Sequence, residues 1–190
     1  MKQGLLIVAI ALGVAASAAS LLGGCLGDEA TATVTFQCPS KEIFTGRRAD
    51  GGPPATGVSA YMERRCGTLD CHGSIYRPMR IYGRIGLRDP SDNNVTGGNG
   101  TTVRELDLNY DSVCNVAPEE MSKAVDDDGA SAEKLIILQK ARGVQGHKGG
   151  VVVLQGSEAD QCLLGWLQSG QHASVDDVAP HCKKAVEELQ

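Results

Sequence analysis

The sequence predicts a mostly α-helical protein with long loops. Apolar residues recur at three- and four-residue steps in residues 58–65 and 158–169, which is the period of a helix with one buried face. Polar stretches rich in glycine and asparagine, such as residues 89–102, separate the helical segments and indicate loops. Only residues 31–36 alternate in the manner of a short strand.

Four helices are expected in order along the chain. The first begins between residues 55 and 59 and runs into Cys66. The second covers residues 118–125, with a proline and two glutamates in its first turn, where both residue types are favourable. The third covers residues 131–141. The fourth covers residues 158–169, which a capping serine precedes and a glycine follows.

The first 24 residues have the composition of a targeting segment. Lys2 supplies a positive charge, and residues 5–19 form an apolar, alanine-rich run that is short for a membrane-spanning helix. The run ends at Leu22-Gly23-Gly24-Cys25, which matches the bacterial lipobox. The sequence therefore predicts a lipoprotein signal peptide over residues 1–24 and a lipidated Cys25 as the mature N-terminus. An ordinary cleaved signal peptide and an uncleaved membrane helix are the alternatives.

The remaining chain is expected to comprise a flexible tether (residues 25–56), one helical domain (57–172) and a C-terminal tail (173–190). A lipidated Cys25 would place it in the cell envelope, bound to membrane lipid and facing the periplasm or the exterior, on an inner or an outer membrane. The formal net charge of −5 argues against nucleic acid as a partner.

The most informative motif is the run from Cys66 to Gly73, which reads Cys-Gly-Thr-Leu-Asp-Cys-His-Gly. Two cysteines followed at once by a histidine are typical of covalent haem attachment, because the thiols add to the porphyrin vinyl groups and the imidazole reaches the iron. Four residues separate Cys66 from Cys71 here, where two are usual. A small-loop disulfide between the two cysteines is the alternative, whereas a zinc site lacks a second close pair of ligands.

The run from Tyr61 to Gly73 resembles the haem-attachment segment of a cytochrome c-like domain, with the wider cysteine spacing found at some haems of multihaem cytochromes. A second resemblance lies downstream. Residues 134–141, the His-Lys-Gly-Gly sequence at 147–150 and the helix that carries Trp166 are similar to the closing segment of bacterial cytochrome c-like domains.

The resemblance implies a class I cytochrome c-like fold that holds one haem c through Cys66 and Cys71. His72 would be the proximal iron ligand. His147, in the loop before the last helix, would be the distal ligand, and a surface histidine is the competing interpretation. Three arginines are expected either to pair with the haem propionates or to face solvent: Arg77, Arg80 and Arg84.

Four further cysteines remain if haem uses the motif, and they allow three disulfide pairings: Cys38, Cys114, Cys162 and Cys182. Two disulfides that tie the tether and the tail to the domain are the natural expectation in an exported protein.

The function predicted from the sequence is one-electron transfer outside the cytoplasm by a membrane-anchored c-type haem protein, with a redox partner that the sequence does not identify. An enzyme is not expected. The alternative is a haem-free, disulfide-stabilised lipoprotein with a degenerate cytochrome c fold, in which Cys66 pairs with Cys71 and the domain is a structural or interaction module.

Overall fold

The computed structural model of the chain describes residues 35–93, 95–170 and 173–190. Phe36 to Gln190 form one compact unit. The predicted signal peptide, Cys25 and most of the predicted strand at residues 31–36 lie outside the described residues. Within these ranges there is no helix long and apolar enough to cross a bilayer.

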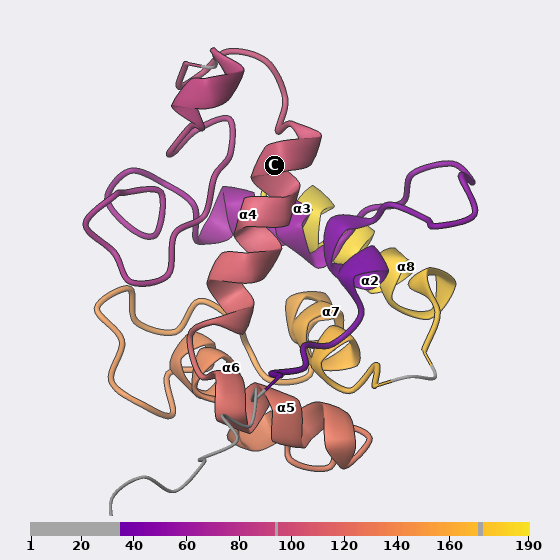
Figure 1. Cartoon of the computed structure of the whole chain (residues 1–190). Coiled ribbons are helices and arrows are strands. Elements are labelled where there is room, and N and C mark those ends of the chain that lie inside the picture. The colour runs from indigo at the N-terminus through magenta and orange to yellow at the C-terminus, as the bar shows by residue number, and fades with distance from the viewer. Residues whose placement is uncertain (1–34, 94, 171–172) are drawn as a thin grey trace, which may run out of the picture. The chain divides into compact units, whose positions relative to one another are not determined.

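This unit is mostly helical (Figure 1). The described residues contain no β-strand, and only Tyr82 and Leu87 form an isolated bridge. The α-helices are α2 (Lys41–Thr45), α3 (Val58–Arg65), α4 (Val103–Cys114), α5 (Pro118–Asp126), α6 (Ile136–Ala141), α7 (Glu158–Leu167) and α8 (Val175–Glu187), and the short 3-10 turns are η1 (Pro90–Asp92) and η2 (Ala132–Lys134).

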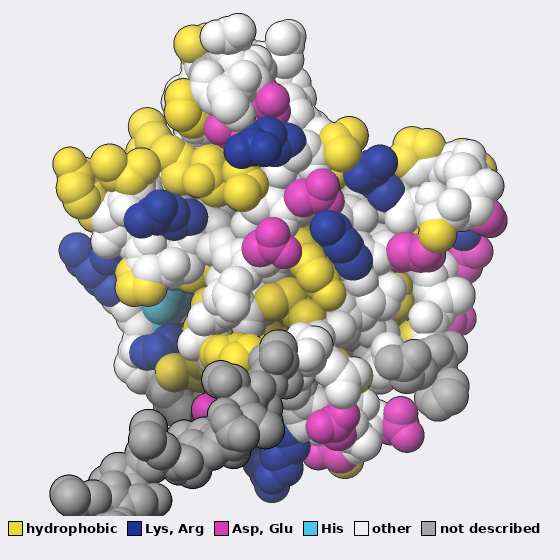
Figure 2. Space-filling model, in the orientation of Figure 1, with side chains coloured by type: hydrophobic (Ala, Val, Ile, Leu, Met, Phe, Trp, Pro, Cys, Tyr) yellow, Lys and Arg dark blue, Asp and Glu magenta, His cyan; other side chains and the backbone are white. Residues whose placement is uncertain are grey.

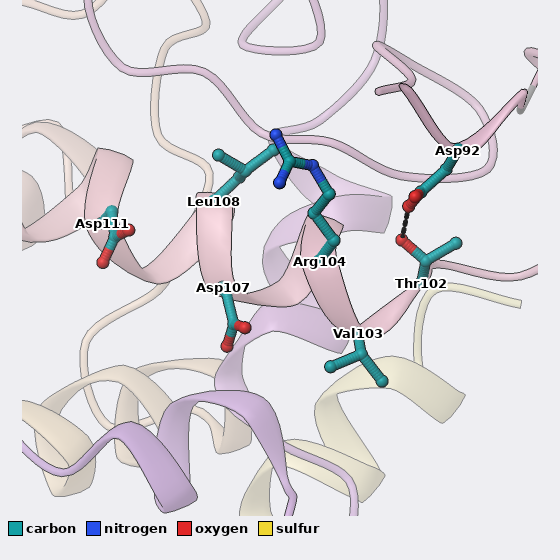
Figure 3. A pocket seen from close by; sticks show the side chains of 7 residues that line it. All are labelled: Asp92, Thr102, Val103, Arg104, Asp107, Leu108 and Asp111. Carbon is teal, nitrogen blue, oxygen red and sulfur yellow. Dashed lines mark hydrogen bonds between the residues drawn. The ribbon is translucent and has the colours of Figure 1, made fainter. Parts of the chain in front are cut away.

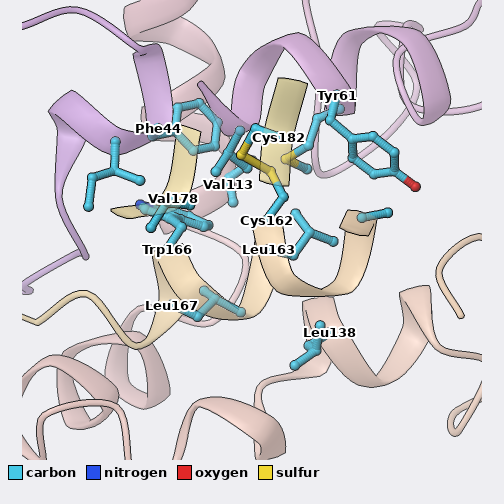
Figure 4. Close-up of a cluster of buried hydrophobic side chains, with 14 of the residues drawn as sticks. Phe44, Tyr61, Val113, Leu138, Cys162, Leu163, Trp166, Leu167, Val178 and Cys182 are labelled. Atoms are coloured by element: carbon cyan, nitrogen blue, oxygen red, sulfur yellow. A yellow bond between two sulfur atoms is a disulfide. The ribbon is translucent and has the colours of Figure 1, made fainter. Parts of the chain in front are cut away.

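The hydrophobic core lies where α7 and α8 pack on each other and on α3. Trp166 of α7 is fully buried, its ring centre lies 4.9 Å from that of Phe44 in α2, and its indole N–H donates to the carbonyl of Ser40 at 3.0 Å. Figure 4 shows these rings beside the disulfide between α7 and α8. A buried tryptophan that also satisfies its polar N–H anchors the segment before α2 to the C-terminal helices.

Two disulfides connect the helices, and their number matches the sequence prediction. One joins Cys38, just before α2, to Cys114 at the end of α4, and the other joins Cys162 of α7 to Cys182 of α8. Each connects an end segment of the unit to a more central helix, as expected for the tether and the tail.

Helices α3, α5 and α7 confirm three of the predicted helices. The predicted third helix differs, because Leu135 adopts an extended conformation (φ −62°, ψ 132°) and divides residues 131–141 into η2 and α6. The extended backbone at Leu135 turns its side chain into the core, where it is 2 % exposed.

The segments expected to be a tether and a tail are more structured than the sequence indicates. Residues 41–45 form α2, which buries Ile43 and Phe44. Residues 175–187 form α8, which packs against α7 and α3. Both helices bury apolar side chains against α3 and α7, and this packing outweighs their short length or low propensity.

Helix α4 is held by a buried polar network that also fixes the preceding loop. The Arg88 guanidinium forms two hydrogen bonds with the Glu105 carboxylate, at 2.8 and 2.9 Å, and donates to the carbonyls of Asn99 and Gly100. Both side chains are almost completely buried. Burial alone would raise the pKa of Glu105, but hydrogen bonds from Arg88 and from the backbone of Thr102 and Asp89 hold it below the usual value.

Candidate functional site

The cysteine motif forms a compact turn directly after α3. Helix α3 ends at Cys66, whose backbone N–H still bonds to the carbonyl of Met62. The N–H groups of Cys71 and Gly73 both donate to the carbonyl of Thr68 at 2.9 Å, and the N–H of His72 donates to the carbonyl of Cys66 at 2.8 Å. The four residues between the cysteines therefore form a tight turn, and this turn places His72 close to the end of α3.

Three glycines make this turn possible. A β-carbon on Gly73 would lie 2.1 Å from the carbonyl oxygen of Gly67, and one on Gly86 would lie 1.8 Å from the same oxygen. Both distances are far below van der Waals contact, so the backbones at 67, 73 and 86 touch directly. Only glycine permits this close approach of backbone to backbone.

His72 is oriented by a backbone carbonyl. Its Nδ1 lies 3.1 Å from the carbonyl oxygen of Met79. Because a carbonyl only accepts, Nδ1 carries the proton and Nε2 is left with its lone pair. Burial lowers the pKa of His72, which the hydrogen bond to Met79 partly offsets. A neutral imidazole with one nitrogen fixed by a carbonyl is the usual form of a metal-ligating histidine.

The structure brings His147 to His72, as the resemblance implied. The centres of the two imidazole rings are 6.1 Å apart and their planes are inclined by 15°. The Nδ1 of His147 also faces a backbone carbonyl, that of Gly150, at 3.3 Å. Both histidines therefore use Nδ1 for a backbone bond and keep Nε2 free.

The rings are stacked, and the distance between their centres matches that expected for two imidazole ligands of one metal ion between them. A metal–imidazole bond is about 2 Å, and the nitrogen lies roughly 1 Å from the ring centre, so the ring centres of two axial ligands lie about 6 Å apart. Within the part of the chain that the structure describes, no group of three or more His, Cys, Asp and Glu side chains is placed to hold an ion. Two histidine nitrogens alone would leave a metal ion with open coordination positions.

Two cavities adjoin along the histidine pair. The first, of about 290 Å³, is mainly apolar. The second, of about 340 Å³, is more polar. Four residues line both cavities: Cys66, His72, His147 and Val152. The apolar walls of the first come mostly from Met62, Met79, Val116, Ile136, Ile137, Ala141 and Leu163.

Cys66 and Cys71 are free thiols at these cavities. The disulfide between them, on which the haem-free interpretation depends, is not formed. Burial raises the pKa of Cys66 to about 12, so its sulfur stays protonated at neutral pH. Cys71 lines only the second cavity. Both cysteines therefore line the second cavity, together with His72.

Arg77 bonds the backbone of the cysteine motif. Its Nε donates to the carbonyl of Cys71 at 3.1 Å and its Nη2 to the carbonyl of Asp70 at 3.2 Å. Arg80 donates to the carbonyl of Arg77, and the side chain of Arg84 faces solvent. On the face drawn in Figure 2, a histidine lies among basic and hydrophobic side chains.

A further depression runs along α4, away from the histidine pair (Figure 3). Its lining is polar and partly acidic, and Thr102 and Asp92 are hydrogen bonded within it. It contains no histidine or cysteine, so it adds no ligand to the site. The residues that line it are Asp92, Thr102, Val103, Arg104, Asp107, Leu108 and Asp111.

No family model, curated protein or solved structure matches the chain. The chemistry of the site therefore has to be argued from its own geometry. The sequence pointed to both thiols and both histidines. It missed the apolar walls from Val116, Ile136 and Ile137, because these residues are distant from the motif in the sequence and follow no pattern related to it.

Proposed function

We propose that this chain is a c-type haem protein that transfers single electrons outside the cytoplasm. The observation that carries the proposal is the pair of near-parallel imidazoles 6.1 Å apart, beside two free thiols. A site made of the two thiols alone does not explain two neighbouring histidines with free Nε2 atoms. A contact between two histidines alone does not explain the thiols.

Each residue then has a defined task. The thiols of Cys66 and Cys71 would hold the porphyrin through thioether bonds, and the Nε2 atoms of His72 and His147 would be the iron ligands. Bound haem supplies an iron that changes its charge by one electron. The apolar walls of the first cavity exclude water from the metal and favour the state with the lower net charge.

Two histidine ligands predict a lower reduction potential than a histidine and a methionine would give. Met62 and Met79 also line the first cavity, so a methionine sulfur is available nearby. The choice of His147 rests on its free Nε2 and on the ring separation, and it is open to a direct test.

The proposed location outside the cytoplasm is supported by the two disulfides, since structural disulfides persist in oxidising compartments. The lipid anchor at Cys25 rests on the lipobox. One acyl chain binds a membrane only marginally, so stable anchoring requires the several chains of a lipoprotein modification.

The first experiment is a visible absorption spectrum of the detergent-extracted protein, oxidised and then reduced with dithionite, together with haem staining of a denaturing gel. We expect a Soret band, sharp reduced α and β bands, and stain that stays with the protein. The variant with Cys66→Ala and Cys71→Ala should lose the stain. A colourless wild-type protein from a host that assembles c-type haem would contradict the proposal.

The distal ligand is tested with His147→Ala. We expect the loss of the six-coordinate, low-spin spectrum of the oxidised protein. His181→Ala is the matched control. His181 lies in α8, is hydrogen bonded to Glu158 of α7 and lines neither cavity. An unchanged spectrum in His147→Ala would exclude His147 and point to a methionine or another ligand.

A further inference from the structure

The turn between Cys66 and Cys71 is fixed at its base but not at its far side. At the base, Gly67 is held against Gly73 and Gly86, and the carbonyl of Thr68 accepts two backbone bonds. At the far side, the side chain of Leu69 is 56 % exposed. One of the two bonds to Thr68 comes from the N–H of Cys71. The turn has two residues more than the usual motif, and the described backbone leaves the carbonyls of Asp70 and Cys71 on this side of it without a hydrogen bond.

Arg77 is the side chain that closes this far side. Its guanidinium reaches back over the turn and donates from two nitrogens to two consecutive carbonyls, those of Asp70 and Cys71. The described residues provide no other hydrogen bond to either carbonyl. A planar guanidinium suits this task, because it offers several N–H donors in a fixed geometry that a lysine ammonium does not match.

The charge of Arg77 is not used elsewhere. No carboxylate of the described chain lies within ion-pair distance of it, although the residue is half-buried and lines the second cavity beside Cys71 and His72. Both side-chain hydrogen bonds of this half-buried arginine end on backbone carbonyls of the motif, and one of them is the carbonyl of Cys71.

We propose that Arg77 is a positioning residue that adapts the wide cysteine spacing to two-point haem attachment. This inference rests on the proposed function. The thiol of Cys71 adds across a vinyl group: the S–H bond breaks, a carbon–sulfur bond forms at the inner vinyl carbon, and the hydrogen goes to the outer one. No electrons are gained or lost, so the position of the sulfur relative to the vinyl group decides whether the step occurs.

The test compares three variants of the full-length protein with the wild type. Arg77→Gln removes the fork, Arg77→Lys keeps the charge and one donor group, and Arg84→Gln removes the same charge from an exposed neighbour with no contact to the turn. Each purified protein is denatured, treated with a thiol-alkylating reagent and weighed by mass spectrometry. The same samples give reduced absorption spectra.

In the wild type and in Arg84→Gln, we expect haem on both cysteines and no alkylation of Cys71. In Arg77→Gln, we expect a large fraction of protein with haem on Cys66 alone. Its Cys71 takes one alkyl group, and its α band moves to longer wavelength because one vinyl group stays conjugated. Loss of two hydrogen bonds should lower the population of the positioned turn by about tenfold. Arg77→Lys should fall between the two.

Two negative outcomes are distinguishable. Haem in the wild type together with full two-point attachment in Arg77→Gln would overturn the role of Arg77 and leave the proposed function intact. If Arg77→Gln does not accumulate, full attachment in Arg77→Lys at the wild-type level overturns it in the same way. A wild-type protein without haem would overturn the proposed function and the inference with it.

Discussion

The helical frame and the site loops of this protein are held together by different means. We call α2, α4, α7 and α8, with the buried ion pairs that Arg88 and Arg142 form with them, the frame, and residues 66–87 together with 143–157 the site loops. The frame has helix caps, a continuous apolar core and both disulfides. The site loops have backbone hydrogen bonds, glycine contacts and an arginine fork, and they border two cavities.

The difference indicates that the frame stabilises the domain, whereas the site loops border the cavities. Cavities and free thiols next to a core are costly for a domain of this size, because each cavity forgoes packing contacts that a filled core would have. The disulfides and the buried Arg88–Glu105 pair at α4 stabilise the frame. Under the proposed function, the loops become fully packed only when haem is present.

The largest effect is expected from removing the Cys38–Cys114 bond, which closes a loop with a sequence separation of 76 residues. Chain entropy predicts a loss of about 4 to 5 kcal/mol for the pair of Cys→Ala changes. The Cys162–Cys182 bond closes a separation of only 20, and its removal should cost about 3 kcal/mol by the same relation. Denaturant unfolding of both double variants measures the two losses. A larger loss for the shorter loop would contradict the entropic account.

A second large effect is expected from Glu105→Gln. The change leaves the buried Arg88 guanidinium without its anionic partner, which typically costs about 3 to 5 kcal/mol. Asp107→Asn is the matched control on the same helix, because its partner Lys41 is exposed, and it should change the unfolding free energy by less than about 1 kcal/mol. Equal losses in the two variants would show that the buried pair contributes no more to the unfolding free energy than the exposed pair does.

The same pair gives a pH dependence with a defined sign. The pKa of Glu105 is lowered in the folded protein, so its ionised form stabilises the fold at pH values above the pKa of the unfolded chain. This contribution disappears as the pH falls through the lowered folded value. The difference between wild type and Glu105→Gln should therefore shrink in acid, which unfolding curves at several pH values measure.

Glu63 should behave in the opposite way. Burial raises its pKa, and hydrogen bonds from Thr101 and Ser59 only partly offset this. The folded state then holds the proton more tightly than the unfolded state, so stability falls as the pH rises from the unfolded pKa through the folded one. Glu63→Gln should increase the unfolding free energy at pH 7 and have no such benefit near pH 3. A loss at pH 7 would contradict this assignment.

The smallest effect on stability is expected in the site loops. In haem-free protein, His147→Ala should change the unfolding free energy by no more than about 0.5 kcal/mol, because the ring bonds only a nearby loop carbonyl. Thermal unfolding of haem-free wild type and variant gives the measurement. A loss comparable to that of Glu105→Gln would mean that the loops contribute to the frame and would remove the distinction drawn above.

The sequence predicted those helices whose buried face is apolar. Helix α7 was recognised with its serine cap because Ala159, Leu163 and Trp166 repeat at helical steps. Helix α4 was missed because its buried positions include Glu105 and Asn109, which are polar. Its capping box at Thr102 and Glu105 was readable in the sequence and would have marked its start.

Helix α8 was hidden for a different reason. It contains Pro180 within the helix, and in the sequence a proline indicates a helix break. Proline is disfavoured in a helix interior, and only packing against α7 overrides this preference. The capping box formed by Ser174 and Asp177 was again the local signal.

In the site, the sequence indicated which side chains carry the chemistry but not how the backbone presents them. The closeness of His147 to His72 followed from the resemblance to a known domain. The direct contact of Gly67 with Gly73 and Gly86 did not, because it depends on where a segment almost 20 residues away comes to lie. The sequence also could not predict that the Arg77 guanidinium bonds the carbonyls of its own loop. An arginine near a haem motif is equally compatible with a propionate contact.

The position of the Cys38–Cys114 bond also decides how the protein responds to mechanical tension. A force applied to the chain ahead of Cys38 passes through the sulfur bridge into the end of α4. The 75 residues between the two cysteines, which include α2, α3 and the turn that carries His72, are thereby excluded from the load. If the N-terminus is tethered, pulling on it leaves this segment unstretched, so the bridge shields the half of the site that carries Cys66, Cys71 and His72, whereas the loop with His147 lies beyond it.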